Sequence, residues 1–95
     1  MKSSEVTKYR SQILAIAARY GASNLRIFGS VARGNSTAES DLDLLIDLED
    51  DRTLLDQIGL KQDLEDLLNC SIDIAEVCSL HPLIRDRVLS ETIAL

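Results

Sequence analysis

The feature that most constrains the fold of this 95-residue chain is an alternation of acidic and apolar residues over 41–48, within the stretch SDLDLLIDL. Aspartate at positions 41, 43 and 47 alternates with leucine or isoleucine at 42, 44 and 46. A two-residue period is typical of a β-strand with one buried face. Leucine is also a good helix former, and Ser40 with Asp43 matches the capping box of a helix N-terminus. The stretch alone leaves both structures open.

Apolar spacing predicts the other elements, which alternate between helix and strand. In chain order they are a helix over 4–19, a strand over 24–28, the stretch 41–48, a helix over 53–68, a strand over 70–77 and a helix over 79–95. Gly21 closes the first helix. Ser79 is the candidate cap of the last helix, and Pro82 lies in its first turn. We therefore predict an α+β fold in the order α-β-β-α-β-α. Its mixed sheet has about three strands with helices on one face, in a single domain over residues 1–95.

The charge of the chain limits its partners. Ten basic and 16 acidic residues give a net charge of −6. Because nucleic-acid backbones are bound by clustered Lys and Arg, direct nucleic-acid binding is not expected, although a nucleotide held through metal ions stays open. No apolar run reaches the roughly 18–20 residues of a membrane span, and the N-terminus lacks the apolar region of a signal peptide. A cytoplasmic protein is expected.

The stretch GSVARG, residues 29–34, is a candidate phosphate loop. A glycine leaving a strand lets backbone N–H groups approach an anion, and Ser30 can cap a short helical turn closed by Gly34. The simpler interpretation is a strand-to-helix turn with a serine cap, which is common. Arg33 either reaches phosphate oxygens or pairs with a neighbouring carboxylate, and we favour the second role.

Three aspartates are candidate metal ligands. On a strand, Asp41 and Asp43 point to one face about 6.5–7 Å apart, a spacing at which carboxylates converge on Mg²⁺. Asp73 lies in the β-patterned run SIDIAEV, where aspartate is disfavoured. If the two strands pair, Asp73 lies beside Asp41 and Asp43. Three carboxylates next to a phosphate loop then form a two-metal site for phosphoryl or nucleotidyl transfer, and this favours a strand over 41–48.

The combination of GSVARG, SDLDLLID and the later SIDIAEV resembles the minimal nucleotidyltransferase (MNT) family of the polymerase-β-like superfamily. All three acidic positions of the family pattern are filled, and the resemblance covers nearly the whole chain. It implies that Gly29 and Ser30 contact the β- and γ-phosphates of a nucleoside triphosphate, and that Asp41 and Asp43 hold two Mg²⁺ ions. Asp73 would complete the metal site and help to deprotonate the attacking hydroxyl.

The resemblance extends to the acceptor. A stand-alone MNT protein is similar to the antitoxin of HEPN–MNT toxin–antitoxin modules, which implies transfer of AMP from ATP to a tyrosine hydroxyl of a HEPN ribonuclease toxin. Two alternatives stay open: an antitoxin that masks its toxin without catalysis, and a nucleotidyltransferase for a small molecule.

The remaining candidates have simpler interpretations. Cys70 and Cys78 are expected to be free thiols, because neither a secretion signal nor enough further zinc ligands accompany them. His81, before Pro82, is expected to cap or pack rather than to catalyse. Arg85 and Arg87 are either solvated or part of a partner-facing surface.

Overall fold

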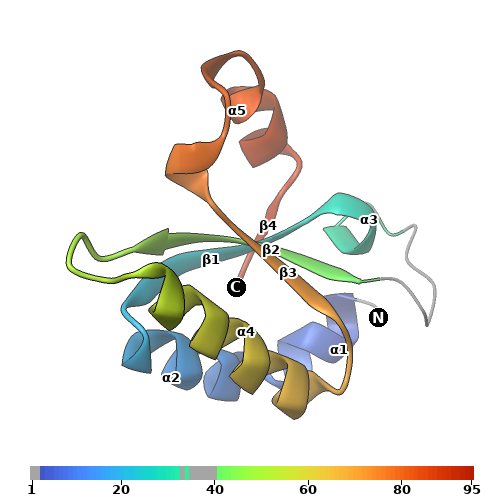
Figure 1. Cartoon of the computed structure of the whole chain (residues 1–95). Coiled ribbons are helices and arrows are strands. Elements are labelled where there is room, and N and C mark those ends of the chain that lie inside the picture. The colour runs from blue at the N-terminus through green and yellow to red at the C-terminus, as the bar shows by residue number, and fades with distance from the viewer. Residues whose placement is uncertain (1–2, 33, 35–40) are drawn as a thin grey trace.

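The computed structural model describes residues 3–32, 34 and 41–95. It has an α+β fold with a four-stranded mixed sheet in the order β3-β2-β1-β4 (Figure 1). Strand β1 pairs antiparallel with β2 and β4, whereas β2 and β3 are parallel. The elements in chain order are α1 (Ser3–Lys8), α2 (Arg10–Arg19), β1 (Ala22–Phe28), α3 (Gly29–Ala32), β2 (Leu42–Leu48), α4 (Leu54–Leu68), β3 (Ile72–Glu76), the 3-10 turn η1 (Val77–Ser79), α5 (Pro82–Ser90) and β4 (Ile93–Ala94).

The predicted α+β class and the β-strand over 41–48 are confirmed, but the sheet has four strands rather than about three. The predicted closing helix ends at Ser90, and Ile93–Ala94 then pair with β1. The amide of Leu95 donates to the carbonyl of Leu25 at 3.0 Å. The physical reason is that the outer edge of β1 carries backbone groups that need partners, and the last residues supply them.

The predicted first helix is divided in two at Tyr9, whose backbone leaves the helical region at φ −100° and ψ 13°. Its amide donates to the carbonyl of Val6, and its side chain is 38% exposed. Gly21 follows α2 with a φ of +74°, which confirms its predicted role at the end of that helix.

Helix α4 has a defined signal at each end. The Thr53 hydroxyl accepts from the amide of Leu55 at 3.2 Å, and the Asp56 carboxylate accepts from the amide of Thr53 at 2.9 Å, so the two residues form a capping box. The helix ends at Asn69, which has a left-handed φ of +52°. These signals fix the register at which α4 presents Leu60 and Leu64 to the sheet.

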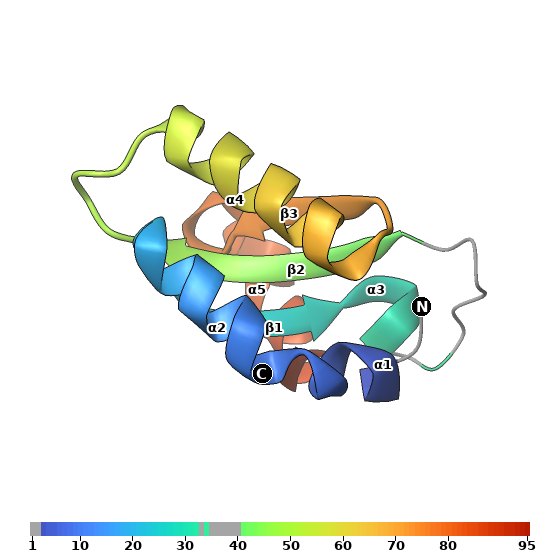
Figure 2. The same ribbon diagram turned by 90° about the horizontal axis from the view of Figure 1, so that it is seen from below.

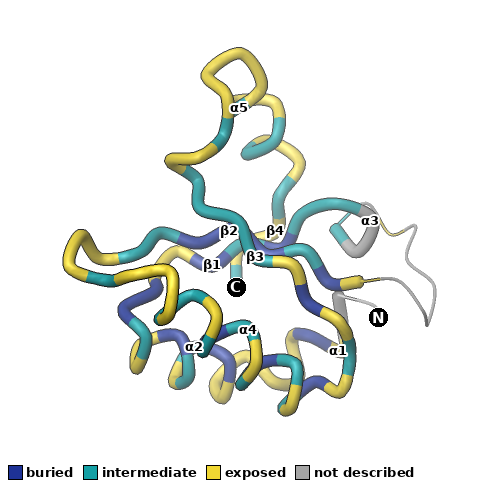
Figure 3. The backbone as a smooth tube through the Cα atoms, in the orientation of Figure 1, coloured by how far each residue is buried: buried dark blue, intermediate teal, exposed yellow. Residues whose placement is uncertain are grey.

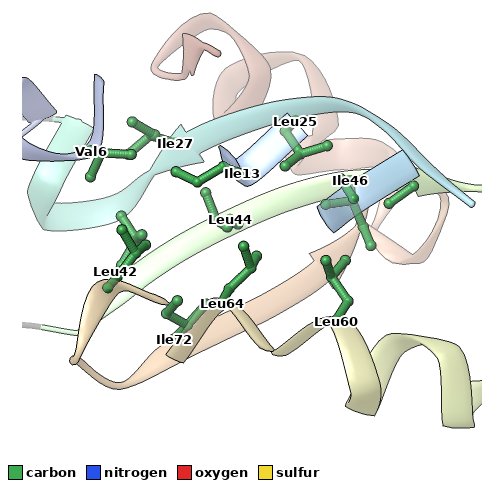
Figure 4. Close-up of a cluster of buried hydrophobic side chains, with 13 residues drawn as sticks. Val6, Ile13, Leu25, Ile27, Leu42, Leu44, Ile46, Leu60, Leu64 and Ile72 are labelled. Carbon is green, nitrogen blue, oxygen red and sulfur yellow. The ribbon is translucent and has the colours of Figure 1, made fainter. Parts of the chain in front are cut away.

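The core lies between one face of the sheet and the layer of α1, α2 and α4, on the lower side in Figure 1 and the near side in Figure 2. Strand residues at alternate positions meet helix residues there, and the side chains labelled in Figure 4 are all buried: Val6, Ile13, Leu25, Ile27, Leu42, Leu44, Ile46, Leu60, Leu64 and Ile72. Burying each such leucine or isoleucine contributes about 1.5–3 kcal/mol. No helix in the described part of the chain is long and apolar enough to cross a membrane.

The prediction of helices on one face holds for α1, α2 and α4 but not for α5, which lies on the other side of the sheet in both views (Figures 1 and 2). No residue of α5 is buried (Figure 3). His81 caps it, because Nδ1 accepts from the amide of Leu83 at 3.1 Å, and Pro82 takes the first helical position. The capping role of His81 is confirmed. The predicted Ser79 cap is wrong: Ser79 lies in η1 and donates its hydroxyl to the carbonyl of Glu76 at 2.7 Å.

We predict that Leu64→Ala lowers the free energy of unfolding by about 2–5 kcal/mol, because it leaves a cavity between α4 and the sheet. Leu54→Ala on the same helix is the matched control, since Leu54 is 68% exposed whereas Leu64 is 0% exposed. Urea unfolding followed by circular dichroism measures both. Equal costs for the two variants would contradict the packing described here.

A second prediction concerns Tyr20, whose hydroxyl donates to the Asp63 carboxylate at 2.6 Å and joins the end of α2 to α4. This hydrogen bond raises the pKa of Tyr20 above its ordinary value of 10.0. A raised pKa stabilises the fold below the unfolded-state value, and that stabilisation is lost as the pH rises through the folded-state value. Tyr20→Phe should therefore be destabilising near pH 7, and the difference from the parent should shrink as the pH rises through the folded-state pKa of Tyr20, which lies above 10.0. Tyr9→Phe is the control, and a difference that does not change with pH would contradict the prediction.

Candidate active site

The alternation in β2 separates its side chains into two sets. Leu42, Leu44 and Ile46 enter the core beneath the helices. Because neighbouring residues of a strand point to opposite faces, Asp43 points to the face that α1, α2 and α4 leave uncovered. Asp43 is half-buried there, and Asp41, one residue before the strand, is exposed. The core pattern of β2 thus directs an acidic side chain to the opposite face.

The parallel pairing of β2 with β3 places Asp43 directly opposite Asp73. Ile72, next to Asp73, is buried in the core, so Asp73 shares the open face with Asp43. Neighbouring strands lie about 4.7–4.9 Å apart, and two like charges directly opposite each other are unfavourable without a counter-ion. The structure therefore brings together two of the three predicted carboxylates, from strands whose nearest ends are 24 positions apart in the sequence.

Gly29 approaches the same carboxylate from the other side. It follows Phe28, the partner of Asp43 in the β1–β2 pairing, and opens α3 with a φ of +73°. A Cβ built at Gly29 would overlap Oδ2 of Asp43. A side chain at position 29 would therefore both strain the backbone and displace the carboxylate, so the absence of one lets Asp43 Oδ2 lie against the backbone of Gly29.

The other predicted loop residues are placed less completely. Ser30 is the second residue of α3, so the short helical turn expected here is present and begins at Gly29. Arg33 lies outside the described residues. Within the parts that the structure describes, no three or more acidic, histidine or cysteine side chains are grouped as one metal site. Asp41 is thus not gathered with Asp43 and Asp73 into a three-carboxylate cluster.

The pair Asp43 and Asp73 nevertheless has the donor chemistry that Mg²⁺ requires. Mg²⁺ takes oxygen ligands and is usually held by one or two carboxylates, with substrate phosphates and water completing the shell. Two carboxylates on one face of the sheet fit this pattern. A third protein ligand is not a requirement for such a cation.

The two thiols do not contribute to this site. Cys70 and Cys78 are both free, as predicted. Burial raises the pKa of Cys70, and a hydrogen bond from Cys78 to the Glu76 carboxylate raises the pKa of Cys78. A raised pKa keeps a thiol protonated, and the protonated form is the weaker nucleophile and metal ligand.

The sequence did not indicate two features of the site: the approach of Gly29 to Asp43, and the position of Phe28 beside Asp43. The alternation of core-facing residues in β1 could have predicted the position of Phe28. Leu25 and Ile27 are buried in the core, so Phe28 falls on the open face. The approach of Gly29 to Asp43 depends on the register between β1 and β2. No local pattern in a single sequence encodes that register.

Comparison with known proteins identifies the family of the chain. Residues 10–95 match the profile of the Nucleotidyltransferase domain family. A Methanocaldococcus jannaschii protein assigned as a protein adenylyltransferase, MJ0435, is 34% identical over 88 residues, which cover 93% of this chain and 95% of that protein. The protein adenylyltransferase MntA of Thermococcus cleftensis is 37% identical over 75 residues, covering 79% of this chain and 76% of the relative.

Solved structures show the same fold. One assigned as a minimal nucleotidyltransferase superposes with a TM-score of 0.89 at 45% identity, over 100% of this chain and 97% of that one. A crystal structure of a toxin–antitoxin with AMP-PNP superposes with a TM-score of 0.73 at 19% identity, over 88% and 69% of the two chains.

The chain therefore belongs to the Nucleotidyltransferase domain family. Within it the protein is an enzyme of the minimal nucleotidyltransferase type, whose curated relatives are named protein adenylyltransferases.

We predict that Gly29→Ala is more destabilising than Gly34→Ala. Both glycines have a left-handed φ, +73° and +75°, so both substitutions incur a backbone strain of about 1–2 kcal/mol. Only the new Cβ at position 29 overlaps Asp43, because position 34 has open space. The additional loss of unfolding free energy caused by Gly29→Ala should disappear when Asp43→Ala is also present. Urea unfolding of the parent, the two single variants and the double variant measures this in a double-mutant cycle. Equal costs at the two glycines would contradict the close approach.

Proposed function

We propose that this protein is an antitoxin nucleotidyltransferase that transfers AMP from ATP to a tyrosine hydroxyl of a cognate HEPN ribonuclease toxin. The reaction would depend on Mg²⁺ and release pyrophosphate. The observation that carries the proposal is the register pair Asp43–Asp73 on the open face of the sheet, with Gly29 against Asp43. Relatives named protein adenylyltransferase, one of them MntA, support a protein as the acceptor. The shared fold of a toxin–antitoxin with AMP-PNP is consistent with a nucleotide substrate.

In the proposed reaction the tyrosine oxygen attacks the α-phosphorus of ATP and forms a new P–O bond. The bond from the α-phosphorus to the oxygen bridging to the β-phosphate breaks, and pyrophosphate leaves with that electron pair. The backbone of Gly29 and Ser30 would bind the β- and γ-phosphates, which orients the leaving group. Arg33 belongs to the same GSVARG loop. It would pair with a neighbouring carboxylate, the role favoured from the sequence.

The carboxylates would divide the remaining work. Asp43 and Asp73 would hold Mg²⁺, and Asp41, exposed just before β2, would reach the site when substrate is bound. Bound Mg²⁺ supplies charge neutralisation at the phosphates and a lowered pKa for the attacking hydroxyl. Asp73 is the exposed member of the pair and is the better placed to accept the tyrosine proton.

We predict that Asp43→Asn and Asp73→Asn each reduce AMP transfer by about 100-fold or more. A metal contributes several kcal/mol to such a transition state, and each 1.36 kcal/mol corresponds to a tenfold change in rate. The assay incubates the protein with α-labelled ATP, Mg²⁺ and the product of the neighbouring gene. It measures label on that partner and locates the modified residue by mass spectrometry.

Asp47→Asn is the matched control, because Asp47 lies on the same strand and alternates to the same face but hydrogen-bonds to Asn24 at 2.9 Å, away from the pair. The Asp47→Asn variant should retain AMP transfer. Chelation of Mg²⁺ with EDTA should abolish AMP transfer in every variant. Toxin inhibition without label, unchanged in Asp43→Asn, would instead show an antitoxin that masks its partner. Label on a small molecule in place of the partner would show the third class of function.

A further inference from the structure

Arg26 is a basic residue on the open face of the sheet that the proposed mechanism does not yet use. Its neighbours Leu25 and Ile27 are buried in the core, so the side chain of Arg26 points to the opposite face of β1. The β1–β2 register places Arg26 directly opposite Leu45 and diagonal to Asp43. Diagonal neighbours in an antiparallel pair are about 7–8 Å apart, a distance that a long side chain spans. The guanidinium of Arg26 can therefore reach a group that is bound beside Asp43.

Arg26 does not have the carboxylate partner that a half-buried cation usually has. Within residues 3–32, 34 and 41–95, the ion pairs are formed by Arg52 and Arg87. Arg26 donates from Nη1 to the hydroxyl of Thr92 at 3.4 Å, which is long for a hydrogen bond. A guanidinium carries five N–H donors, so most of those of Arg26 are left for a ligand.

The open face is covered on one side of Arg26 and accessible on the other. Leu45 is 0% exposed although it does not belong to the core beneath α1, α2 and α4, so other side chains cover it on the open side. Figures 1 and 2 place α5 on this side of the sheet. The partly buried residues of α5 have the spacing of one helix face: Arg85, Val88 and Leu89. Asp43, by contrast, is half-buried and Asp73 is exposed. Arg26 thus lies at the border between the covered part and the two carboxylates.

We propose that Arg26 binds the α-phosphate of the nucleotide, the group that is transferred. This inference rests on the proposed function and names a further residue that holds its substrate. The order of residues along β1 supports it. Gly29, in the loop proposed for the β- and γ-phosphates, follows Phe28, the partner of Asp43, whereas Arg26 lies two residues before Phe28. Gly29 and Arg26 therefore flank the level of Asp43 on opposite sides, and a triphosphate with its far end at Gly29 brings its α-phosphate toward Arg26.

The chemistry of arginine suits this group. A guanidinium stays protonated, and its planar fork donates two parallel N–H···O bonds to two oxygens of one phosphate. During phosphoryl transfer the charge is spread over the equatorial oxygens of the phosphorus that is attacked. Arg26 would bind two of these oxygens from β1, while Asp43 and Asp73 would hold Mg²⁺. The long contact with Thr92 would be exchanged for charge-assisted hydrogen bonds.

Arg85 on α5 competes with Arg26 for this role. Its side chain is half-buried, and its Nε is withdrawn from solvent without a hydrogen-bond partner in the described part of the chain. Arg87 on the same helix is exposed and pairs with Glu91 at 4.0 Å. We assign the α-phosphate to Arg26 because the β1–β2 pairing fixes its position relative to Asp43.

The test measures the Kd of the full chain for AMP, for pyrophosphate and for ATP by calorimetry in the presence of Mg²⁺. Arg26→Gln should raise the Kd for AMP and for ATP about tenfold or more, because hydrogen bonds to a charged phosphate are lost. The Kd for pyrophosphate should be unchanged, since pyrophosphate carries only the groups assigned to the Gly29 loop. Arg26→Lys keeps the charge without the planar fork and should recover part of the AMP binding.

Three control variants separate substrate binding from a structural role. Thr92→Val removes the hydroxyl that Arg26 contacts, and Arg85→Gln removes the competing cation. Arg10→Gln removes an exposed arginine from α2, in the helix layer on the other side of the sheet. All three should bind AMP as the parent does. If Arg26→Gln lowers the thermal midpoint, Arg26→Lys carries the test, because it must still weaken AMP binding relative to pyrophosphate binding.

The outcomes also distinguish this inference from the proposed function. An unchanged Kd for AMP in Arg26→Gln overturns the inference, as does a parent that binds neither AMP nor ATP. An equal loss of AMP binding in Thr92→Val overturns it by showing that Arg26 acts through the position of α5. A loss in Arg85→Gln alone moves the α-phosphate contact to α5. AMP binding that depends on Arg26, in a parent that transfers no AMP to its partner, supports the α-phosphate site and removes the proposed transfer to a toxin.

Discussion

The parallel pairing of β2 with β3 is the contact on which both the core and the candidate site depend. In one register it puts Leu42 beside Ile72 beneath the helices and Asp43 beside Asp73 on the opposite face. A slip of one residue would bury the aspartates and expose the aliphatic side chains, a change that the apolar core strongly disfavours. The hydrophobic effect thus fixes the register, and the register fixes the position of the carboxylates. Two adjacent negative charges are tolerated because they lie at the solvent side of a pairing that the core has already determined.

Much of this arrangement could be predicted from the sequence, because local periodicity encodes it. The alternation over 41–48 predicts which residues of β2 face the core, and a lone aspartate in a β-patterned run identifies Asp73. The expected pairing of the two strands placed these residues together, and the resemblance to the MNT family added the role of each one in the reaction. The predicted roles of His81, Gly21 and the free thiols are also confirmed, since each depends on local geometry or on composition.

The features that could not be predicted depend on contacts between distant parts of the chain. The fourth strand forms because β1 has an open edge, and nothing in the sequence around Ile93 records that edge. The break at Tyr9 interrupts a segment whose apolar spacing is helical throughout. The approach of Gly29 to Asp43 requires the β1–β2 register, which joins residues 14 or more positions apart. Asp41 illustrates a different limit, because it lies one residue before β2 and, among the described residues, is not grouped with Asp43 and Asp73.

Because α5 buries none of its residues, its sequence is released from the demands of the core. Substitutions on most helices of a small domain alter stability and function together, whereas here the outward-facing positions can vary at little cost in folding free energy. Such a helix can diverge between related chains while the sheet and its carboxylates stay the same. Its exposed positions could be substituted while Asp43 and Asp73 are left untouched.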